Sequence, residues 1–196
     1  MLRPLFRVIL ALACFVLTSC QILPPPSHGV SRWVSSLQPD SWKSVSYWDD
    51  DGSPGKPWMK VDLSRQIATF YRGDHKIGVA AISSGDERHR TPSGEYRILE
   101  KLEEKYSGSY GHIENAEGKV VNADATPRTR VPPGCKYCPA PMPYWMRLTW
   151  YGIGMHQGFL PGYAASHGCI RMDKAVVQKF FHASHVGMRV KVVGGD

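Results

Sequence analysis

Residues 155–158 (MHQG) and 166–172 (SHGCIRM) are the stretch of the chain that decides its interpretation. They bring the imidazoles of His156 and His167 close in sequence to the thiol of Cys169, with Arg171 two residues further on. A base converts a thiol into a nucleophilic thiolate, and neighbouring positive charge lowers the pKa of the thiol. The stretch therefore predicts a nucleophilic cysteine served by two histidines. A buried structural cysteine with two surface histidines is the alternative.

Gly168, directly before the cysteine, allows the backbone to approach a ligand closely. Backbone N–H groups near it could hold an oxyanion that develops on a substrate carbonyl. The segment between the two parts of the motif contains Gly and Pro, so the chain can fold back and one imidazole can face the sulfur.

The order of an upstream His, then Ser-His-Gly-Cys, then Arg resembles the L,D-transpeptidase catalytic domain family, which is YkuD-like. The similarity covers about residues 58–194. Four further landmarks resemble the family's opening strand, its next two turns and the segment before its catalytic strand, and they lie at 61–66, 84–85, 91–94 and 141–147.

The resemblance implies a β-sandwich-like domain that acts on peptidoglycan stem peptides through a cysteine thioester, without a cofactor. By motif match, His156 is the general base and acid, His167 orients the sulfur, and Gly168 and Cys169 lie at the oxyanion position. The predicted substrate-binding residues are Ser166, Arg171, Arg147 and Tyr144. A bracing role for Arg171 and a strand-edge position for Arg147 are the alternatives.

Three functions are compatible with this motif. The first is a transferase that passes the thioester to an amine of a neighbouring stem. The second is a carboxypeptidase or amidase that passes it to water. The third is a non-catalytic wall-binding lipoprotein, against which the intact set of His156, His167 and Cys169 argues.

The N-terminus resembles a bacterial lipoprotein signal. Residues 1–7 are short and basic, residues 8–17 are apolar but too short to span a bilayer, and small residues precede Cys20. We expect a signal peptide at 1–19 and a lipid anchor on Cys20. This would place the protein at the periplasmic face of the cell envelope, on the outer membrane if the cell is Gram-negative. A plain signal peptide with an incidental cysteine is the alternative.

Residues 20–57 are rich in Pro and Ser and predict a tether, although their three tryptophans suggest that part of the segment packs on the domain. From residue 58 the pattern predicts a mainly β domain with short strands, including a hairpin that turns at 72–74. Residues 100–142 predict a long irregular insertion. A helix is expected over 173–185, capped by Asp173, before a last strand at 188–193.

Cys135 and Cys138 form a C-x-x-C within the expected insertion. A disulfide is the leading prediction, because the expected compartment is oxidising. A zinc half-site is an alternative that no second C-x-x-C or close His pair completes, so we predict no metal. Reduced, inert thiols are the third possibility.

The composition is that of a globular protein of 196 residues, with 42% hydrophobic and 21% charged residues. It excludes wholesale disorder. No apolar stretch reaches the ~18 residues of a bilayer-spanning helix, which excludes a multi-span membrane protein. The net charge of +7 comes from scattered basic residues. It suits an anionic partner but gives no reason to expect nucleic acid. We expect a monomer.

Overall fold

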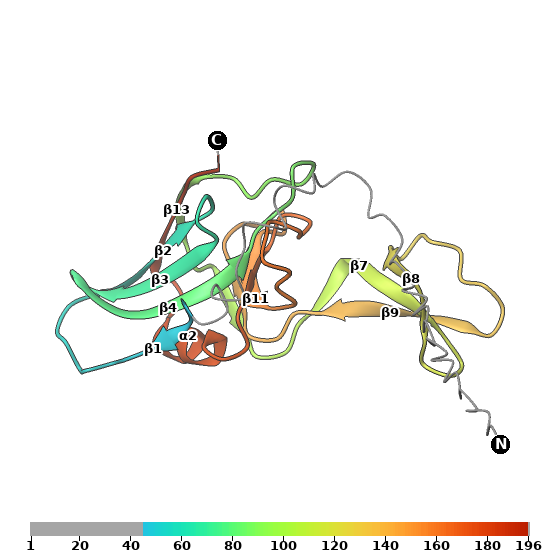
Figure 1. Ribbon diagram of the computed structural model, residues 1–196, viewed down its shortest axis with the longest axis horizontal. Helices are drawn as coiled ribbons and strands as arrows, with labels where there is room; N and C mark the ends of the chain where they lie inside the picture. The colour runs from blue at the N-terminus through green and yellow to red at the C-terminus, as the bar shows by residue number, and fades with distance from the viewer. Residues whose placement is uncertain (1–44, 196) are drawn as a thin grey trace, which may run out of the picture.

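A curled ten-stranded mixed sheet and a three-stranded arm form the protein, as the computed structural model of residues 45–195 shows (Figure 1). The predicted signal peptide, the lipidation site Cys20 and most of the predicted tether lie outside the described residues. Within 45–195, no helix is long and apolar enough to cross a membrane.

Nine strands of the large sheet follow one another in space, and β1 (Tyr47–Trp48) pairs separately with β4. In spatial order the nine are β5 (Gly94–Arg97), β13 (Arg189–Val193), β2 (Pro57–Asp62), β3 (Ile67–Arg72), β4 (His75–Ser83), β12 (Ile170–Met172), β11 (Gly154–Gln157), β10 (Trp145–Arg147) and β6 (Glu100–Leu102). The pairs β13–β2 and β11–β12 are parallel. The predicted hairpin is confirmed, because β3 and β4 pair antiparallel across Gly73.

The core lies in the curl of this sheet and is closed on one side by α2 (Val177–Ala183). The helix turns Phe180 inward, where its ring lies 5.5 Å from the ring of Phe70 on β3. Both side chains are fully buried. The prediction of a mainly β domain with one helix before the last strand is therefore confirmed for the described residues.

The helix is shorter than predicted. Asp173 does not cap it: the N-cap is Val176, which makes no side-chain cap bond. Instead the Asp173 carboxylate accepts the Ala175 N–H at 2.9 Å and closes a separate turn ahead of the helix. The helix ends at Ala183, before the expected end at residue 185, and its C-cap is Ser184, whose backbone is extended.

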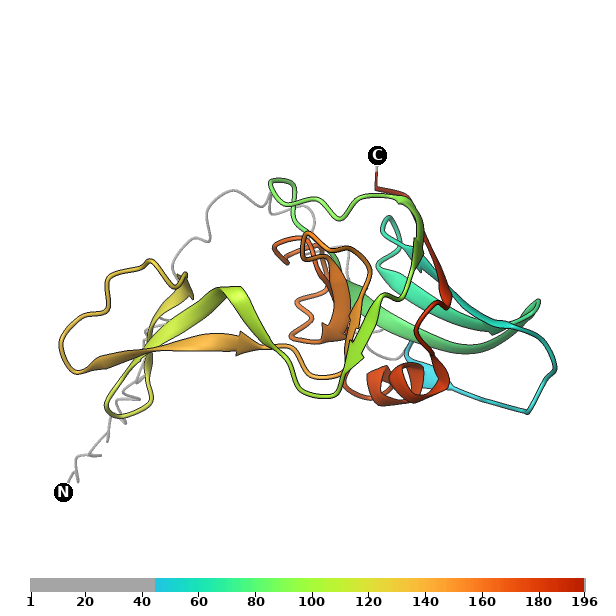
Figure 2. The same cartoon turned by 180° about the vertical axis from the view of Figure 1, so that it is seen from behind.

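The expected irregular insertion is mostly β-structure. After β6, the chain forms β7 (Tyr106–Asn115), β8 (Val120–Ala125) and β9 (Cys135–Pro141), which make an antiparallel sheet in the order β8-β7-β9. This sheet, which we call the arm, projects from the main body in both views of the ribbon (Figures 1 and 2). Its only buried hydrophobic side chains are Ile113 and Ala125. With so little core, its strands lack the apolar alternation from which strands are predicted.

Residues 145–154, in which apolar side chains recur in a strand-like way, do not form one continuous strand. The first part of this run is β10, which pairs antiparallel with β11 after a turn at 148–153. Thr149 holds this turn, because its hydroxyl accepts the Ile153 N–H at 2.9 Å.

The sheet also extends upstream of the expected boundary at residue 58. Trp48 on β1 pairs with Gly78 on β4 and packs against Phe70 and Phe180, with ring centroids 5.2 and 5.5 Å away. A Cβ added to Gly78 would lie 2.6 Å from the Trp48 ring, so glycine is required beneath this tryptophan. The expectation that part of 20–57 packs on the domain is thus met by Trp48.

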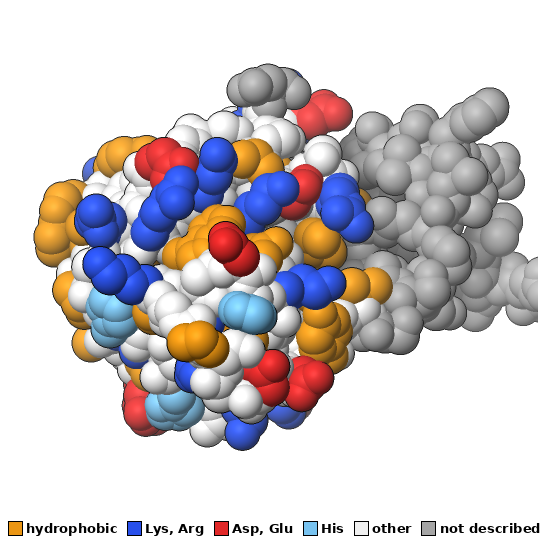
Figure 3. Space-filling view, turned by 90° about the vertical axis from the view of Figure 1, so that its left-hand side faces the viewer, with side chains coloured by type: hydrophobic (Ala, Val, Ile, Leu, Met, Phe, Trp, Pro, Cys, Tyr) orange, Lys and Arg blue, Asp and Glu red, His pale blue; other side chains and the backbone are white. Residues whose placement is uncertain are grey.

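The end of the body remote from the arm carries a mixed surface. Figure 3 shows Lys and Arg side chains on this face interspersed with Asp, Glu and hydrophobic side chains. The positive charge there forms no continuous basic area.

Candidate active site

Two parallel strands bring the predicted nucleophile and base together. His156 on β11 pairs with Arg171 on β12. Cys169 directly precedes Ile170, the first residue of β12, which pairs with Met155, so the register brings the Cys169 loop beside the start of β11. The side chains of Cys169, His156 and Arg171 all line one open cleft of about 670 Å³ between the arm and the main body.

The Cys169 thiol is half-buried at the end of its loop, where it donates to the Gly152 carbonyl at 3.4 Å. Burial raises the pKa of this thiol above its ordinary value. A backbone hydrogen bond from Gly154 and the charges of Arg171 and Arg147 oppose the rise without cancelling it. Burial therefore outweighs the neighbouring positive charge that was expected to lower the pKa of this thiol.

The imidazole of His156 is well suited to take the thiol proton. The side chain is 7% exposed, and burial lowers its pKa to about 4, so the ring is neutral at neutral pH. Its Nδ1 lies 2.7 Å from the Gln157 carbonyl oxygen. Since a carbonyl only accepts, Nδ1 must carry the proton, which leaves the lone pair of Nε2 free.

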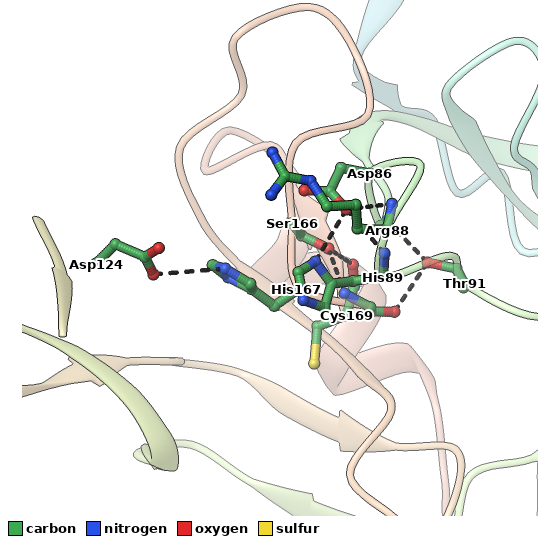
Figure 4. Close-up of polar contacts among 10 residues, drawn as sticks. Asp86, Arg88, His89, Thr91, Asp124, Ser166, His167 and Cys169 are labelled. Atoms are coloured by element: carbon green, nitrogen blue, oxygen red, sulfur yellow. Dashed lines mark hydrogen bonds and ion pairs between the residues drawn. The ribbon is translucent and has the colours of Figure 1, made fainter. Parts of the chain in front are cut away.

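His167 contacts the arm and the ring of His89. Its ring stacks on Tyr110 of β7 at 4.2 Å between centroids, and Nε2 lies 3.5 Å from a carboxylate oxygen of Asp124 on β8. The ring of His89 lies edge-on at 4.7 Å. Figure 4 shows His167 reaching toward Asp124 while Sγ of Cys169 points in another direction. The described contacts of His167 therefore join the catalytic loop to the arm.

The loop that carries the nucleophile is braced from inside. The Ser166 hydroxyl donates to the Cys169 carbonyl and accepts the Gly168 N–H at 3.2 Å. Ser166 lines the cleft but is only 2% exposed, and its hydroxyl is used within the loop. The Gly168 N–H donates to the Ser166 hydroxyl. Of the two residues predicted to hold an oxyanion, Cys169 therefore remains the candidate donor through its backbone N–H.

Thr91 ties this loop to the large sheet. Its buried hydroxyl donates to the Gly168 carbonyl at 2.8 Å and accepts the Gly85 N–H at 2.9 Å (Figure 4). Gly168 has φ +108°, a conformation that favours glycine. At Gly85 an added Cβ would lie 1.9 Å from the His89 carbonyl oxygen. Thr91 and Gly85 belong to two of the sequence landmarks, but their bracing role was not predicted.

Of the remaining predicted substrate-binding residues, two line the cleft and one does not. Arg171 lies in the cleft, with its aliphatic stem against Gly158. Arg147 also lines the cleft, but its Nε lies 3.1 Å from Glu100 and its guanidinium lies over the Trp145 ring at 5.5 Å. Tyr144 is outside the cleft: its ring packs on Phe181 of α2, with ring centroids 5.6 Å apart. The structure therefore does not place Tyr144 with the other predicted substrate-binding residues.

The cleft is basic. Lys105, Arg147 and Arg171 lie on its walls, and no Asp or Glu of the described chain lines it. Tyr151 and Phe159 add aromatic side chains that are 73% and 77% exposed. Such a cleft suits an extended ligand that carries carboxylates.

The predicted disulfide between Cys135 and Cys138 is not formed, and both are free thiols. They lie on the regular strand β9, opposite Asn115 and His112 of β7. Three residues of extended chain span about 10 Å, beyond the Cα separation of about 7 Å that a disulfide tolerates. The two side chains also point to opposite faces of the arm.

A thiol, an imidazole with a free Nε2 and a braced loop in one open cleft are the groups that a nucleophilic-cysteine site requires. The family model of the L,D-transpeptidase catalytic domain, YkuD, matches residues 56–192, and the chain belongs to this family. No significant match to a curated protein was found.

Solved L,D-transpeptidases share the fold. The enzyme from Mycobacterium smegmatis is 16% identical, with a TM-score of 0.53 over 71% of this chain and 59% of that chain. L,D-transpeptidase 1 from Mycobacterium tuberculosis is 20% identical, with a TM-score of 0.51 over 71% and 62%. The C442S mutant from Enterococcus faecium is 22% identical, with a TM-score of 0.50 over 71% and 50%. This chain thus spans roughly half to three fifths of these proteins.

Proposed function

We propose that the protein is a peptidoglycan L,D-transpeptidase whose nucleophile is Cys169. The sulfur attacks the carbonyl of the third residue of a stem peptide, forming a carbon–sulfur bond as the bond to D-alanine breaks. The thiol proton passes to Nε2 of His156 and from there to the departing amine. An amine of a second stem then attacks the thioester, forms the new amide and restores the thiol.

The geometry of His156 is the observation that carries this proposal. A base must accept a proton, and the Gln157 carbonyl fixes the tautomer in which Nε2 can do so. Its lowered pKa keeps that nitrogen unprotonated across the neutral range. The same cleft holds the thiol, so proton transfer and attack can take place in one bound complex.

The walls of the cleft support the proposed substrate class. Stem peptides carry carboxylates, and Lys105 and Arg171 present positive charge to the cleft. Burial lowers the pKa of Arg171 from its ordinary value, yet a guanidinium stays protonated near neutrality. In this proposal Arg171 binds a stem carboxylate, whereas Arg147 is held by Glu100.

Membership of this family implies work on the cell wall, and hence in the envelope. We propose that lipidated Cys20 anchors the protein to the membrane at the periplasmic face and that residues 20–57 extend the domain toward the wall. We also propose that the enzyme acts as a monomer without a cofactor. Labelling with radioactive palmitate tests the anchor, because Cys20→Ala should abolish incorporation.

One product analysis tests the reaction. The purified protein and its Cys169→Ala variant are each incubated with tetrapeptide muropeptides, and the products are identified by mass spectrometry. Cross-linked dimers with the wild type alone support the transpeptidase. Tripeptides without dimers mean that water takes the thioester, as in a carboxypeptidase. Unchanged substrate with both proteins would favour a wall-binding protein.

A further inference from the structure

We propose that one face of the arm is a binding site for a zinc-like divalent metal ion, with His112, Glu114 and Cys138 as its ligands. This site is separate from the catalytic cleft and goes beyond the proposed function.

The strand register assembles the three residues. His112 on β7 is paired directly with Cys138 on β9, and Glu114 follows His112 by two residues, so all three side chains lie on one face of the sheet. One imidazole nitrogen, one carboxylate oxygen and the sulfur lie within 4.8 Å of one another. Nε2 of His112 is 3.5 Å from Oε2 of Glu114. All three residues are half-buried, so an ion could bind without unfolding the arm.

The donor set defines the class of metal. Imidazole nitrogen, thiolate sulfur and carboxylate oxygen are the ligands of Zn²⁺, and three protein ligands with water in the fourth position make a common coordination. The mixture of soft and borderline donors disfavours Mg²⁺ and Ca²⁺, which prefer oxygen. The sequence alone did not show that metal-binding side chains from another strand, β7, lie beside Cys138.

Two neighbours bear on the site. Nζ of Lys136 lies 2.8 Å from Oε1 of Glu114, so a metal ion would share this carboxylate with the ammonium group, while Oε2 lies on the side of His112. Cys135 lies on the opposite face of β9 and is a free thiol, so it does not consume Cys138 in a disulfide. Metal binding replaces the S–H bond of Cys138 with a metal–sulfur bond and releases the proton to solvent.

The location connects the site to the cleft. The metal would join β7 to β9 one residue pair beyond Gly111 and Pro139. On the same strand, Tyr110 lies two residues before His112 and stacks on His167. We therefore expect an ion at this site to stiffen the part of the arm that contacts the catalytic loop.

Cobalt(II) is the probe, because thiolate coordination to Co²⁺ gives an intense charge-transfer absorption that the other ligands do not give. The full chain is used in detergent with Cys169→Ala, so that the catalytic thiol cannot bind the ion. Cys138→Ser is compared with Cys135→Ser, a matched control on the opposite face. Glu114→Gln and His112→Ala test the other ligands.

The proposal predicts a saturable charge-transfer band that Cys135→Ser retains and Cys138→Ser abolishes. Loss of either other ligand should weaken Co²⁺ binding by more than the ~10-fold that loss of an outer-shell partner can cost. Zn²⁺ should displace the cobalt and raise the melting temperature of the Cys169→Ala protein but not of its Cys138→Ser derivative. Absence of a saturable band in a protein folded by circular dichroism, or a band that survives Cys138→Ser, would overturn the proposal.

Discussion

At the residue scale, burial favours the neutral forms of Cys169 and His156, the proposed catalytic pair. Burial raises the pKa of Cys169 and lowers the pKa of His156, so each shift opposes a resting thiolate–imidazolium pair. The consequence is that the thiol proton must move when substrate is bound and the carbonyl is in place. Such a site protects its sulfur from indiscriminate alkylation at neutral pH.

The rate of Cys169 alkylation by iodoacetamide should therefore rise with pH. Because the thiol pKa is raised above its ordinary value of 9.0, the thiolate fraction should still be increasing at pH 9. Peptide mapping after short exposures measures the rate at this one cysteine. A rate that stays level from about pH 5 to 8 would indicate a resting ion pair and contradict the neutral pair.

The two histidines should differ on substitution. His156→Ala should lower turnover by at least ~10²-fold, because the general base is lost. His167→Ala should lower it less, since the contacts of His167 are with Tyr110 and Asp124 of the arm. Single-turnover kinetics with the same muropeptide measure both. A nearly unaffected His156→Ala beside an inactive His167→Ala would reverse the roles.

Sequence was sufficient to predict that Cys169 and His156 lie in one cleft, because a contiguous motif and one upstream histidine mark them. It was insufficient to predict the directions in which the side chains of Ser166 and Tyr144 point. Ser166 turns its hydroxyl into its own loop, and Tyr144, with φ +58°, turns its ring onto α2. No local pattern encodes these orientations, which follow from packing of segments distant in sequence.

At the element scale, the catalytic loop depends on one threonine. Thr91→Val keeps the shape but leaves the Gly85 N–H and the Gly168 carbonyl without their partner. An unsatisfied buried polar group costs about 1–3 kcal/mol, so the free energy of unfolding should fall by that order. Turnover should fall as well, because Gly168 adjoins the nucleophile.

Thr91→Ser is the matched control. It retains the hydroxyl and should stay close to wild type in turnover, with a small loss of stability from the missing methyl group. Denaturant unfolding and muropeptide turnover are measured on both variants. Equal stability and turnover for Thr91→Val and wild type would show that the brace is dispensable.

The arm shows why strands that bury few apolar side chains are difficult to predict from sequence. Its strands are mostly exposed, register shifts interrupt the β7–β8 pairing, and Gly and Pro residues punctuate the sequence. The core strands were predictable because their apolar side chains recur in short bursts between turns, as in β4, where seven consecutive residues are buried. Long-range pairing of β7 with β9 has no comparable local signal.

At the scale of the whole molecule, the segment upstream of the family match is part of the packed structure. The family model begins at residue 56, whereas Trp48 lies against Phe70 and Phe180 in the core. Trp48→Ala should lower the free energy of unfolding by up to the ~3–5 kcal/mol typical of aromatic truncation in a core. Tyr47→Ala, at a neighbour that is 40% exposed, should change it by only about 0.5 kcal/mol.

Thermal and denaturant unfolding compare these two variants directly. If Trp48→Ala were as stable as Tyr47→Ala, the packing of β1 would contribute little to the stability of the domain. A selective loss at Trp48 would establish that the folded unit starts before residue 56.

The central claim is that Cys169 forms a thioester with the stem peptide. Its most direct test is the mass of the full-length enzyme, acid-quenched during turnover with a tetrapeptide muropeptide and mapped by peptide sequencing. We predict an added mass equal to the muropeptide minus D-alanine, located on Cys169 and absent from Cys169→Ala. An adduct on Cys135 or Cys138, or product formation that persists in Cys169→Ala, would contradict the account.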